Sequence, residues 1–219
     1  MAVKFNEHWN IIPEHFDEYV EFMQQWRIPT MNNLGIKIVA LWGALIGASP
    51  QIISEGVAED LDKVEMGLKS DEFKKTNIKL LQLVTDYRSK ILIPSGRFPH
   101  LPRVIEKGNV KFSQYWDIIP GKEKEYDDFI RTVHYPAMEE IGIRVAGEWY
   151  VLIGESPHIF YEARADMAEQ LLNALRNPKF RVIKRDLLKL VRNYSSRVLV
   201  FHAFRAKGGT ADDYEFFLV

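Results

Sequence analysis

The sequence predicts an α+β fold of two tandem βαββαβ modules, the ferredoxin-like order, packed sheet to sheet as a single-chain α+β barrel. The first observation is an internal repeat, because the segment ending at Pro13 recurs at Pro120, and this offset of 107 residues holds without a gap to Ser89 and Ser196. The second is that both copies alternate strand-like and helix-like patterns in the same order. A repeat of this length is a whole folding unit, so we expect an intramolecular pseudo-dimer.

Each copy opens with a strand and then a helix. Residues 3–12 are rich in aromatic and branched side chains, and Pro13, like Pro120, suits the first turn of a helix. Apolar residues then recur at helical spacing, which predicts an amphipathic helix with one buried face. These residues are Phe16, Tyr19, Val20, Met23 and Trp26 in the first copy, and Tyr126, Phe129, Ile130, Val133 and Met138 in the second.

A β-hairpin follows the first helix of each copy. Gly35 and Gly142 lie where a helix would end in a left-handed cap. The next segments are too short and too rich in β-favouring residues for a second helix, and a Ser-Pro step then suits a reversal of the chain. The predicted hairpins are residues 36–46 with 51–57, and residues 143–153 with 158–163.

A second helix and a last strand complete each copy. The helical pattern of the first copy breaks near Ser70-Asp71 and continues to Tyr87. In the second copy Asn177-Pro178 marks the break, and the pattern runs from Phe180 to Tyr194. The predicted last strands are residues 89–93 and 196–204.

Module 1 is predicted at residues 1–94, a linker at 95–110, module 2 at 111–205 and a C-terminal tail at 206–219. The apolar end of the tail suits docking on a sheet edge or on a partner. The helices of such a module cover only one face of its sheet. Residues 36–46 are largely apolar on both faces, so we expect each sheet to bury the other's second face.

The composition narrows the classes of function. The 219 residues include 29 basic and 30 acidic ones, interspersed along the chain, so the charge pattern predicts no binding to nucleic acid or to an anionic membrane. Cysteine is absent, which excludes thiol nucleophiles and thiolate metal sites. No leader pattern opens the sequence and no apolar run reaches the ~20 residues of a membrane span, so we expect a cytoplasmic protein.

The pattern resembles the dimeric α+β barrel superfamily, and within it the NIPSNAP-like branch. The resemblance spans nearly the whole chain outside the linker and the tail. It rests on residues 115–120, Gly121-Lys122, Pro136, Gly142, Trp149, Gly154, His158 and residues 177–180, which the first copy follows in weaker form. The superfamily contains cofactor-independent monooxygenases and haem-binding relatives of chlorite dismutase, so the resemblance implies a fold and leaves the activity open.

Acidic residues on the strands are the first candidates for catalysis. Glu55 and Glu162 occupy equivalent places in the third strands, whereas Glu148 lies among apolar neighbours and has Leu41 at its place in the first copy. A carboxylate in such surroundings could serve as an acid or base. The repeated pair is alternatively a structural contact that the duplication copied. We take Glu148, Glu162 and His158 as catalytic candidates, and the difference at Glu148 favours a site in the second module.

Aromatic residues suggest a binding site for an apolar or aromatic ligand. Trp149, Tyr150, Trp42 and Tyr115 are the candidates for lining an apolar pocket. Because tryptophans also recur at matching positions, packing within the core or between the sheets is the alternative.

The histidines predict no metal site made by the protein. None of the six has a second histidine at the short spacing that places two ligands on one helix or strand face. A single axial histidine could still hold haem, and His134 and His202 are the candidates.

The sequence thus predicts a protein that binds or transforms a small apolar or aromatic compound without metal or cofactor, resembling a cofactor-independent monooxygenase. A further homodimer of the whole chain is left open. One alternative is a haem-binding protein related to the chlorite dismutase group. Another is a non-catalytic scaffold or assembly protein.

Overall fold

The computed structural model describes residues 2–47, 51–98, 109–205 and 214–216. The chain divides into two compact units: unit 1 is Met1–Leu92 with Phe201–Val219, and unit 2 is Ile93–Val200. The Ser-Pro turn of the first copy, most of the linker and most of the tail lie outside the described residues. The module boundaries and the packing of one sheet on the other stay predictions.

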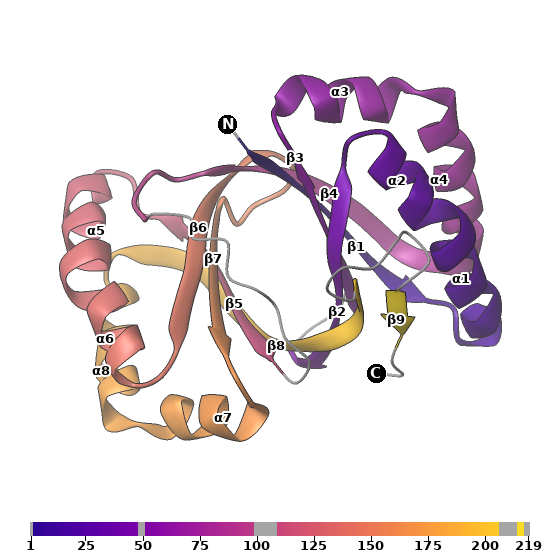
Figure 1. The fold of residues 1–219 in the computed structure, drawn as a ribbon. Helices are drawn as coiled ribbons and strands as arrows, with labels where there is room; N and C mark the ends of the chain where they lie inside the picture. The colour runs from indigo at the N-terminus through magenta and orange to yellow at the C-terminus, as the bar shows by residue number, and fades with distance from the viewer. Residues whose placement is uncertain (1, 48–50, 99–108, 206–213, 217–219) are drawn as a thin grey trace. The chain divides into compact units, whose positions relative to one another are not determined.

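Unit 1 has the predicted βαββαβ order, with each helical region divided into two segments. Its antiparallel strands follow the order β2-β3-β1-β4, and α1 to α4 lie together beside them (Figure 1). The elements are β1 (Val3–Ile11), α1 (Phe16–Phe22), α2 (Ile28–Asn33), β2 (Lys37–Ile46), β3 (Ile52–Ala58), α3 (Leu61–Lys69), α4 (Asp71–Leu83) and β4 (Val84–Pro94).

Unit 2 repeats this order, and its strands follow β6-β7-β5-β8. Residues 191–200 of β8 belong to unit 2 and residues 201–205 to unit 1. β9 (Tyr214–Phe216) pairs with the end of β8, which is one of the two placements that the sequence left open for the tail. The other elements are β5 (Val110–Ile118), α5 (Glu123–Phe129), α6 (Tyr135–Glu140), β6 (Arg144–Ile153), β7 (Ile159–Ala165), α7 (Ala168–Arg176), α8 (Pro178–Leu187) and β8 (Val191–Arg205).

Local signals at the element ends agree with the sequence. Gly35 and Gly142 both have a φ of 84°, the left-handed cap conformation that favours glycine. The predicted break near Ser70 is confirmed: α3 ends before Ser70, whose Oγ accepts a hydrogen bond from the backbone N–H of Phe73 at 3.1 Å and so caps α4. Asn177 caps α8 in the same way, with a bond of 2.9 Å from the N–H of Lys179.

The first helix of each unit contains a π-turn that the apolar spacing does not reveal. Met23–Arg27 joins α1 to α2, and Ile130–His134 joins α5 to α6. A π-turn adds a residue to the turn and rotates the remainder of the helix about its axis. Trp26 and Val133, predicted to be buried, are therefore 62% and 46% exposed. The residues that follow them, Arg27 and His134, are buried instead.

The last strands begin earlier than predicted. Val84 and Tyr87 belong to β4, and Val191 and Tyr194 to β8, although all four continue the helical spacing. Each strand starts with an irregular stretch at which its register with the neighbouring strand shifts. The left-handed residues Asp86 and Asn193, with φ of 54° and 55°, lie in these stretches. Because of this irregularity, the apolar residues at the start of each strand recur at intervals that resemble helical spacing.

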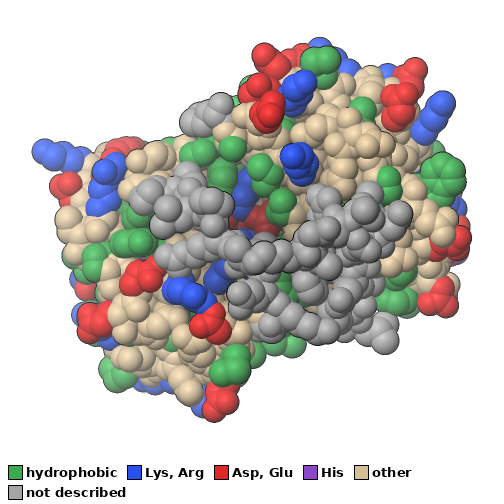
Figure 2. All heavy atoms as spheres, in the orientation of Figure 1, with side chains coloured by type: hydrophobic (Ala, Val, Ile, Leu, Met, Phe, Trp, Pro, Cys, Tyr) green, Lys and Arg blue, Asp and Glu red, His purple; other side chains and the backbone are tan. Residues whose placement is uncertain are grey.

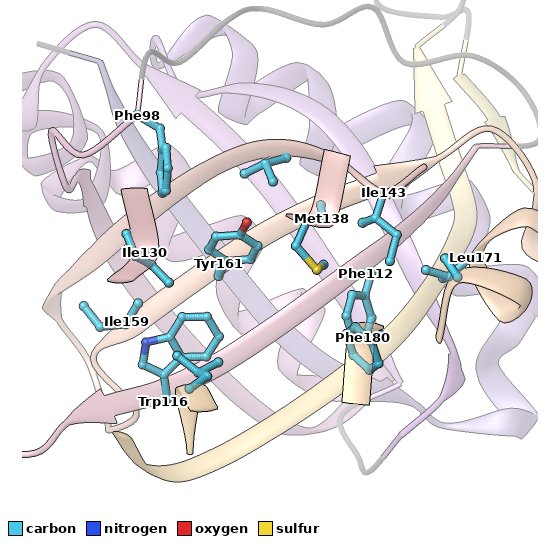
Figure 3. Packing of buried hydrophobic residues seen from close by; sticks show 14 of the residues in the cluster. Phe98, Phe112, Trp116, Ile130, Met138, Ile143, Ile159, Tyr161, Leu171 and Phe180 are labelled. Atoms are coloured by element: carbon cyan, nitrogen blue, oxygen red, sulfur yellow. The ribbon is translucent and has the colours of Figure 1, made fainter. Parts of the chain in front are cut away.

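The core of unit 2 lies between its sheet and its helices. Trp116, Tyr161, Ile159 and Phe112 project from β5 and β7 toward Ile130, Met138, Leu171 and Phe180 (Figure 3). Cross-strand partners share a face, so every strand residue of unit 2 can be assigned to this helix-covered face or to the opposite, helix-free face.

Charged side chains of both signs are interspersed over the face shown in Figure 2, in keeping with the balanced composition. Among the described residues, no helix is both long and apolar enough to cross a membrane.

Candidate functional site

The neighbouring candidates on β6 point to opposite faces of the sheet. Glu148 pairs with Tyr161 of β7 and therefore lies on the helix-covered face, as does Tyr150. Trp149 pairs with Phe160 and lies on the helix-free face. Because side chains alternate along a strand, these three residues cannot line one pocket. The structure separates them into two clusters.

Glu148 is buried beneath α5 and has both carboxylate oxygens bonded. Arg97 Nη1 donates to Oε1 at 2.6 Å, and the hydroxyl of Tyr126 donates to Oε2 at 2.5 Å. Arg97 Nε also donates to Asp127 at 2.5 Å, and its Nη2 donates to the hydroxyl of Tyr150. The side chains of Glu148 and Arg97 are 0% and 6% exposed, whereas that of Asp127 is 43% exposed, so this polar network runs from the core to the surface.

The charges of this cluster are set by burial and by mutual attraction. Burial lowers the pKa of Arg97, but the carboxylates of Glu148 and Asp127 raise it beyond its usual range, so the guanidinium stays charged. Burial, followed by the charge of Glu148, raises the pKa of Tyr126 well above its usual value. Tyr126 is therefore a hydrogen-bond donor to Glu148 and no source of a phenolate at neutral pH.

Sequence reasoning missed Arg97, which comes from the linker. The signal that could have found it is the asymmetry of the repeat, since Leu41 stands in the first copy where Glu148 stands in the second. A buried carboxylate absent from one copy needs a cation that the repeat does not supply.

Glu162 belongs to a contact that occurs in both units. It forms an ion pair with Lys111 and accepts a hydrogen bond of 2.9 Å from Trp149 Nε1. Glu55 makes the same contacts in unit 1, with Lys4 and with Trp42 Nε1 at 2.8 Å. The repetition favours the structural reading of this pair. Trp42 also stacks on Phe201, at 4.4 Å between ring centroids.

An aromatic pair on the helix-free face of unit 2 has no equivalent in unit 1. The rings of Tyr115 and Phe160 stack at 5.0 Å with an interplanar angle of 10°. Arg197 lies 5.7 Å from the centre of the Tyr115 ring, and Lys111 Nζ lies 5.3 Å from that of Phe160. The positions corresponding to Tyr115, Phe160 and Arg197 in the first copy are occupied by His8, Ile53 and Lys90.

His158 lies apart from both clusters, at the end of the β6–β7 hairpin. Its backbone N–H and its Nδ1 are both 2.8 Å from Oδ1 of Asp117, and Ser156 and Asn193 donate to the other oxygen at 2.6 and 2.8 Å. Burial raises the pKa of Asp117, but these donors outweigh it and lower that pKa below its usual value. These hydrogen bonds to Asp117 stabilise the turn between β6 and β7.

The two histidines considered for haem are enclosed by aromatic rings. The ring of His134 lies 5.0 Å from that of Tyr161, 6.1 Å from Phe129 and 6.3 Å from Trp116. His202 lies 6.2 Å from Phe16 and 5.9 Å from Tyr19. An axial ligand must turn a nitrogen toward a pocket wide enough for the macrocycle, so neither histidine fits this role.

Burial lowers the pKa of His134 to about 3, so its ring is neutral. Over the described part of the chain, no three histidine, aspartate or glutamate side chains come together as a metal site would require.

No known family profile matches the sequence, and no curated protein matches it. Solved structures do match the fold. A "Putative monooxygenase" from Fusobacterium nucleatum subsp. nucleatum has 12% identity and a TM-score of 0.65, covering 99% of this chain and 98% of its own. An anthrone oxidase-like protein has 12% identity and a TM-score of 0.60, covering 95% and 94%. A "Putative Chlorite dismutase" has 9% identity and a TM-score of 0.64, covering 97% and 96%.

The structural neighbours also include a NIPSNAP family protein from Agrobacterium tumefaciens, 17% identical, which covers 45% of this chain and 98% of its own with a TM-score of 0.38. Proteins named as NIPSNAP family members and as monooxygenases thus both occur among the structural neighbours. The full-length matches confirm the fold class, α+β with the ferredoxin-like order. At these identities the likeness concerns the fold alone.

Proposed function

We propose that this protein binds a small planar aromatic compound on the helix-free face of the unit 2 sheet, beside Tyr115, Phe160 and Trp149. The observation that carries the proposal is the stacked Tyr115–Phe160 pair, with ring centroids 5.0 Å apart, at positions where the first copy has His8 and Ile53.

Comparison of the two copies supports this placement of the site. The Lys-Glu-Trp contact occurs in both units, so packing of the module accounts for it. Tyr115 and Phe160 are not repeated in the first copy, and the stacked rings of unit 1 are Trp42 and Phe201 instead, so a folding role shared by the modules does not account for this particular pair. The two parallel rings are buried, at 9% and 2% exposed, so a planar ligand would bind by replacing the groups that cover them, and Arg197 adds a positive charge beside them. Ligand sites typically combine apolar rings with a few polar groups in this way.

Transformation of the same ligand without a metal is the second candidate function. It is supported by the monooxygenase and anthrone oxidase names of full-length neighbours. Among the three catalytic candidates, only Glu162 shares the helix-free face with the aromatic pair. Glu148 is held by Arg97 on the other face, and His158 is held by Asp117 at the turn. Glu162 is also bonded, to Lys111 and Trp149, but it lies on the face proposed for the ligand, so any proton transfer is assigned to Glu162 on the ground of its position.

The test uses two planar aromatic probes, 1-naphthoic acid and anthrone, with binding followed by thermal shift and by tyrosine and tryptophan fluorescence. Tyr115→Leu and Phe160→Leu remove one ring each. Because an aromatic pair contributes about 0.5–1.5 kcal/mol beyond its buried area, we expect each variant to bind about two- to twelvefold more weakly. Oxygen uptake with anthrone then tests transformation.

The matched control is His8→Leu, which removes a ring at the equivalent position of unit 1 and should leave probe affinity unchanged. Lack of saturable binding by the natural protein would refute the proposal and leave the scaffold reading. Equal losses in His8→Leu and Tyr115→Leu would also refute the placement of the site. A Soret band in the purified protein would instead favour the haem-binding alternative.

A further inference from the structure

The guanidinium of Arg97 lies in surroundings that resemble a ligand site more than a simple ion pair. Its central carbon is 5.0 Å from the centre of the Tyr126 ring and 4.9 Å from that of the Tyr150 ring. Three of its nitrogens have separate acceptors: Nε bonds to Asp127, Nη1 to Glu148 and Nη2 to the Tyr150 hydroxyl. Two rings and two carboxylates thus surround one cation.

Regular secondary structure supplies all of these acceptors and rings. Tyr126 and Asp127 come from α5, and Glu148 and Tyr150 from β6. Trp116 Nε1 donates to the Tyr126 hydroxyl at 3.0 Å, and that hydroxyl donates to Glu148 at 2.5 Å. Tyr126 and Glu148 are therefore held in place by bonds that do not involve Arg97.

Arg97 itself comes from the short segment after β4. One backbone hydrogen bond anchors that segment to β6: Ser95 N–H donates to the carbonyl of Glu148 at 3.0 Å. Within the segment, Arg97 N–H donates to Ser95 Oγ at 3.2 Å. The cation is thus carried by a connection, whereas its surroundings belong to the core of unit 2. This division is the one expected between an occupant and its receptor.

The comparison of the two copies supports the same division. Val20, Leu41 and Gly43 stand in the first copy where Asp127, Glu148 and Tyr150 stand in the second. Only the tyrosine of α5 is common to both. The aspartate, the glutamate and the second tyrosine are thus present only in unit 2, and all three bond to the same guanidinium.

We propose that Tyr126, Asp127, Glu148 and Tyr150 form a guanidinium-binding site, that Arg97 is its internal occupant, and that an external alkylguanidinium binds there when the Arg97 side chain is absent or displaced. The planar cation is matched by its separate acceptors and by the flanking rings. A compact ammonium group satisfies fewer of these acceptors at once, and neutral urea lacks the charge.

The experiment is chemical rescue of Arg97→Ala with N-methylguanidinium at up to about 20 mM and constant ionic strength. Removing the cation leaves Glu148 buried without its partner, so the variant is destabilised. A bound guanidinium should reverse this. At ten times its Kd it should lower the unfolding equilibrium constant about elevenfold, with a saturable rise in Tm. The natural protein should change less than about twofold, because tethered Arg97 competes at high effective concentration.

Arg97→Ala combined with Glu148→Gln is the matched control and should show no saturable response. Urea and methylammonium at the same concentrations should leave Arg97→Ala unchanged or shift it much less. If Arg97→Ala lacks native circular dichroism in buffer, recovery of that signal with N-methylguanidinium is the readout. Absence of rescue, or equal responses to urea or in the double variant, would overturn the proposal.

Discussion

At the scale of single residues, the two units bury polar groups at one equivalent place in different ways. Unit 1 has Arg27 there, donating to Glu7 at 2.5 Å, with both side chains 1% exposed. Unit 2 has the neutral pair His134 and Gln114 at the same positions. Burying an ionised pair needs its charges to be mutually satisfied, whereas a neutral pair avoids that cost. Unit 1 thus has both charges at this place and unit 2 has neither.

The neutrality of His134 predicts a stability that depends on pH. Its pKa is about 3 in the folded protein against 6.5 in the unfolded chain, so acid protonates the unfolded state first. The contribution is fully present above about pH 6.5 and is lost progressively as the pH falls toward 3. Between pH 7 and pH 5 the loss should be about 2 kcal/mol.

Urea unfolding at pH 7 and pH 5 checks this, with His134→Gln as the comparison. Between pH 7 and pH 5 the unfolding free energy of His134→Gln should fall by about 2 kcal/mol less than that of the natural protein, whatever the stability of the variant at pH 7. Equal losses in the two proteins would show that the imidazole is able to take up a proton in the folded state.

At the scale of elements, the π-turns decide which residues of the first helices face the core. Ordinary helical spacing places Trp26 inward, but the turn at Met23–Arg27 places Arg27 there instead. Element order and helix caps were predictable because they depend on local residues such as Gly35 and Ser70. A π-turn was not predictable, since it depends on tertiary contacts such as the 3.0 Å bond from Arg27 to Thr76 of α4.

The π-turn predicts a reversal of the mutational pattern expected from hydrophobicity. Trp26→Gln should change the unfolding free energy by less than about 0.5 kcal/mol, because the side chain is 62% exposed. Arg27→Gln should cost about 3–5 kcal/mol, because it leaves Glu7 buried without its cation. Urea unfolding at pH 7 measures both changes. A larger cost for Trp26→Gln than for Arg27→Gln would contradict the turn.

At the scale of the whole molecule, the repeat made the fold predictable and obscured the clusters. Packing residues such as Trp9 and Trp116 repeat, so their pattern gave the βαββαβ order twice. Sequence proximity misled for Glu148 and Trp149, because alternation along β6 sends them to opposite faces. Arg97 lies in a connection where no periodicity constrains it, so only the lack of a first-copy counterpart to Glu148 could have indicated it.

The repeat also provides an internal control for the last prediction, which concerns Glu55 and Glu162. Each carboxylate is buried with a lysine and a tryptophan, so Glu55→Gln and Glu162→Gln should destabilise the protein by similar amounts, about 3 kcal/mol each. Only Glu162 shares a sheet face with Tyr115 and Phe160. Glu162→Gln should therefore weaken binding of 1-naphthoic acid, and Glu55→Gln should not.

Urea unfolding and fluorescence titration of the same two variants separate the structural role from the binding role. A much smaller stability cost for Glu162→Gln would show that the second copy of the contact is no longer needed for folding. Equal loss of probe affinity in both variants would show that binding responds to general destabilisation, because unit 1 holds the same contact without the aromatic pair. Selective loss in Glu162→Gln, at equal stability cost, would locate binding on unit 2.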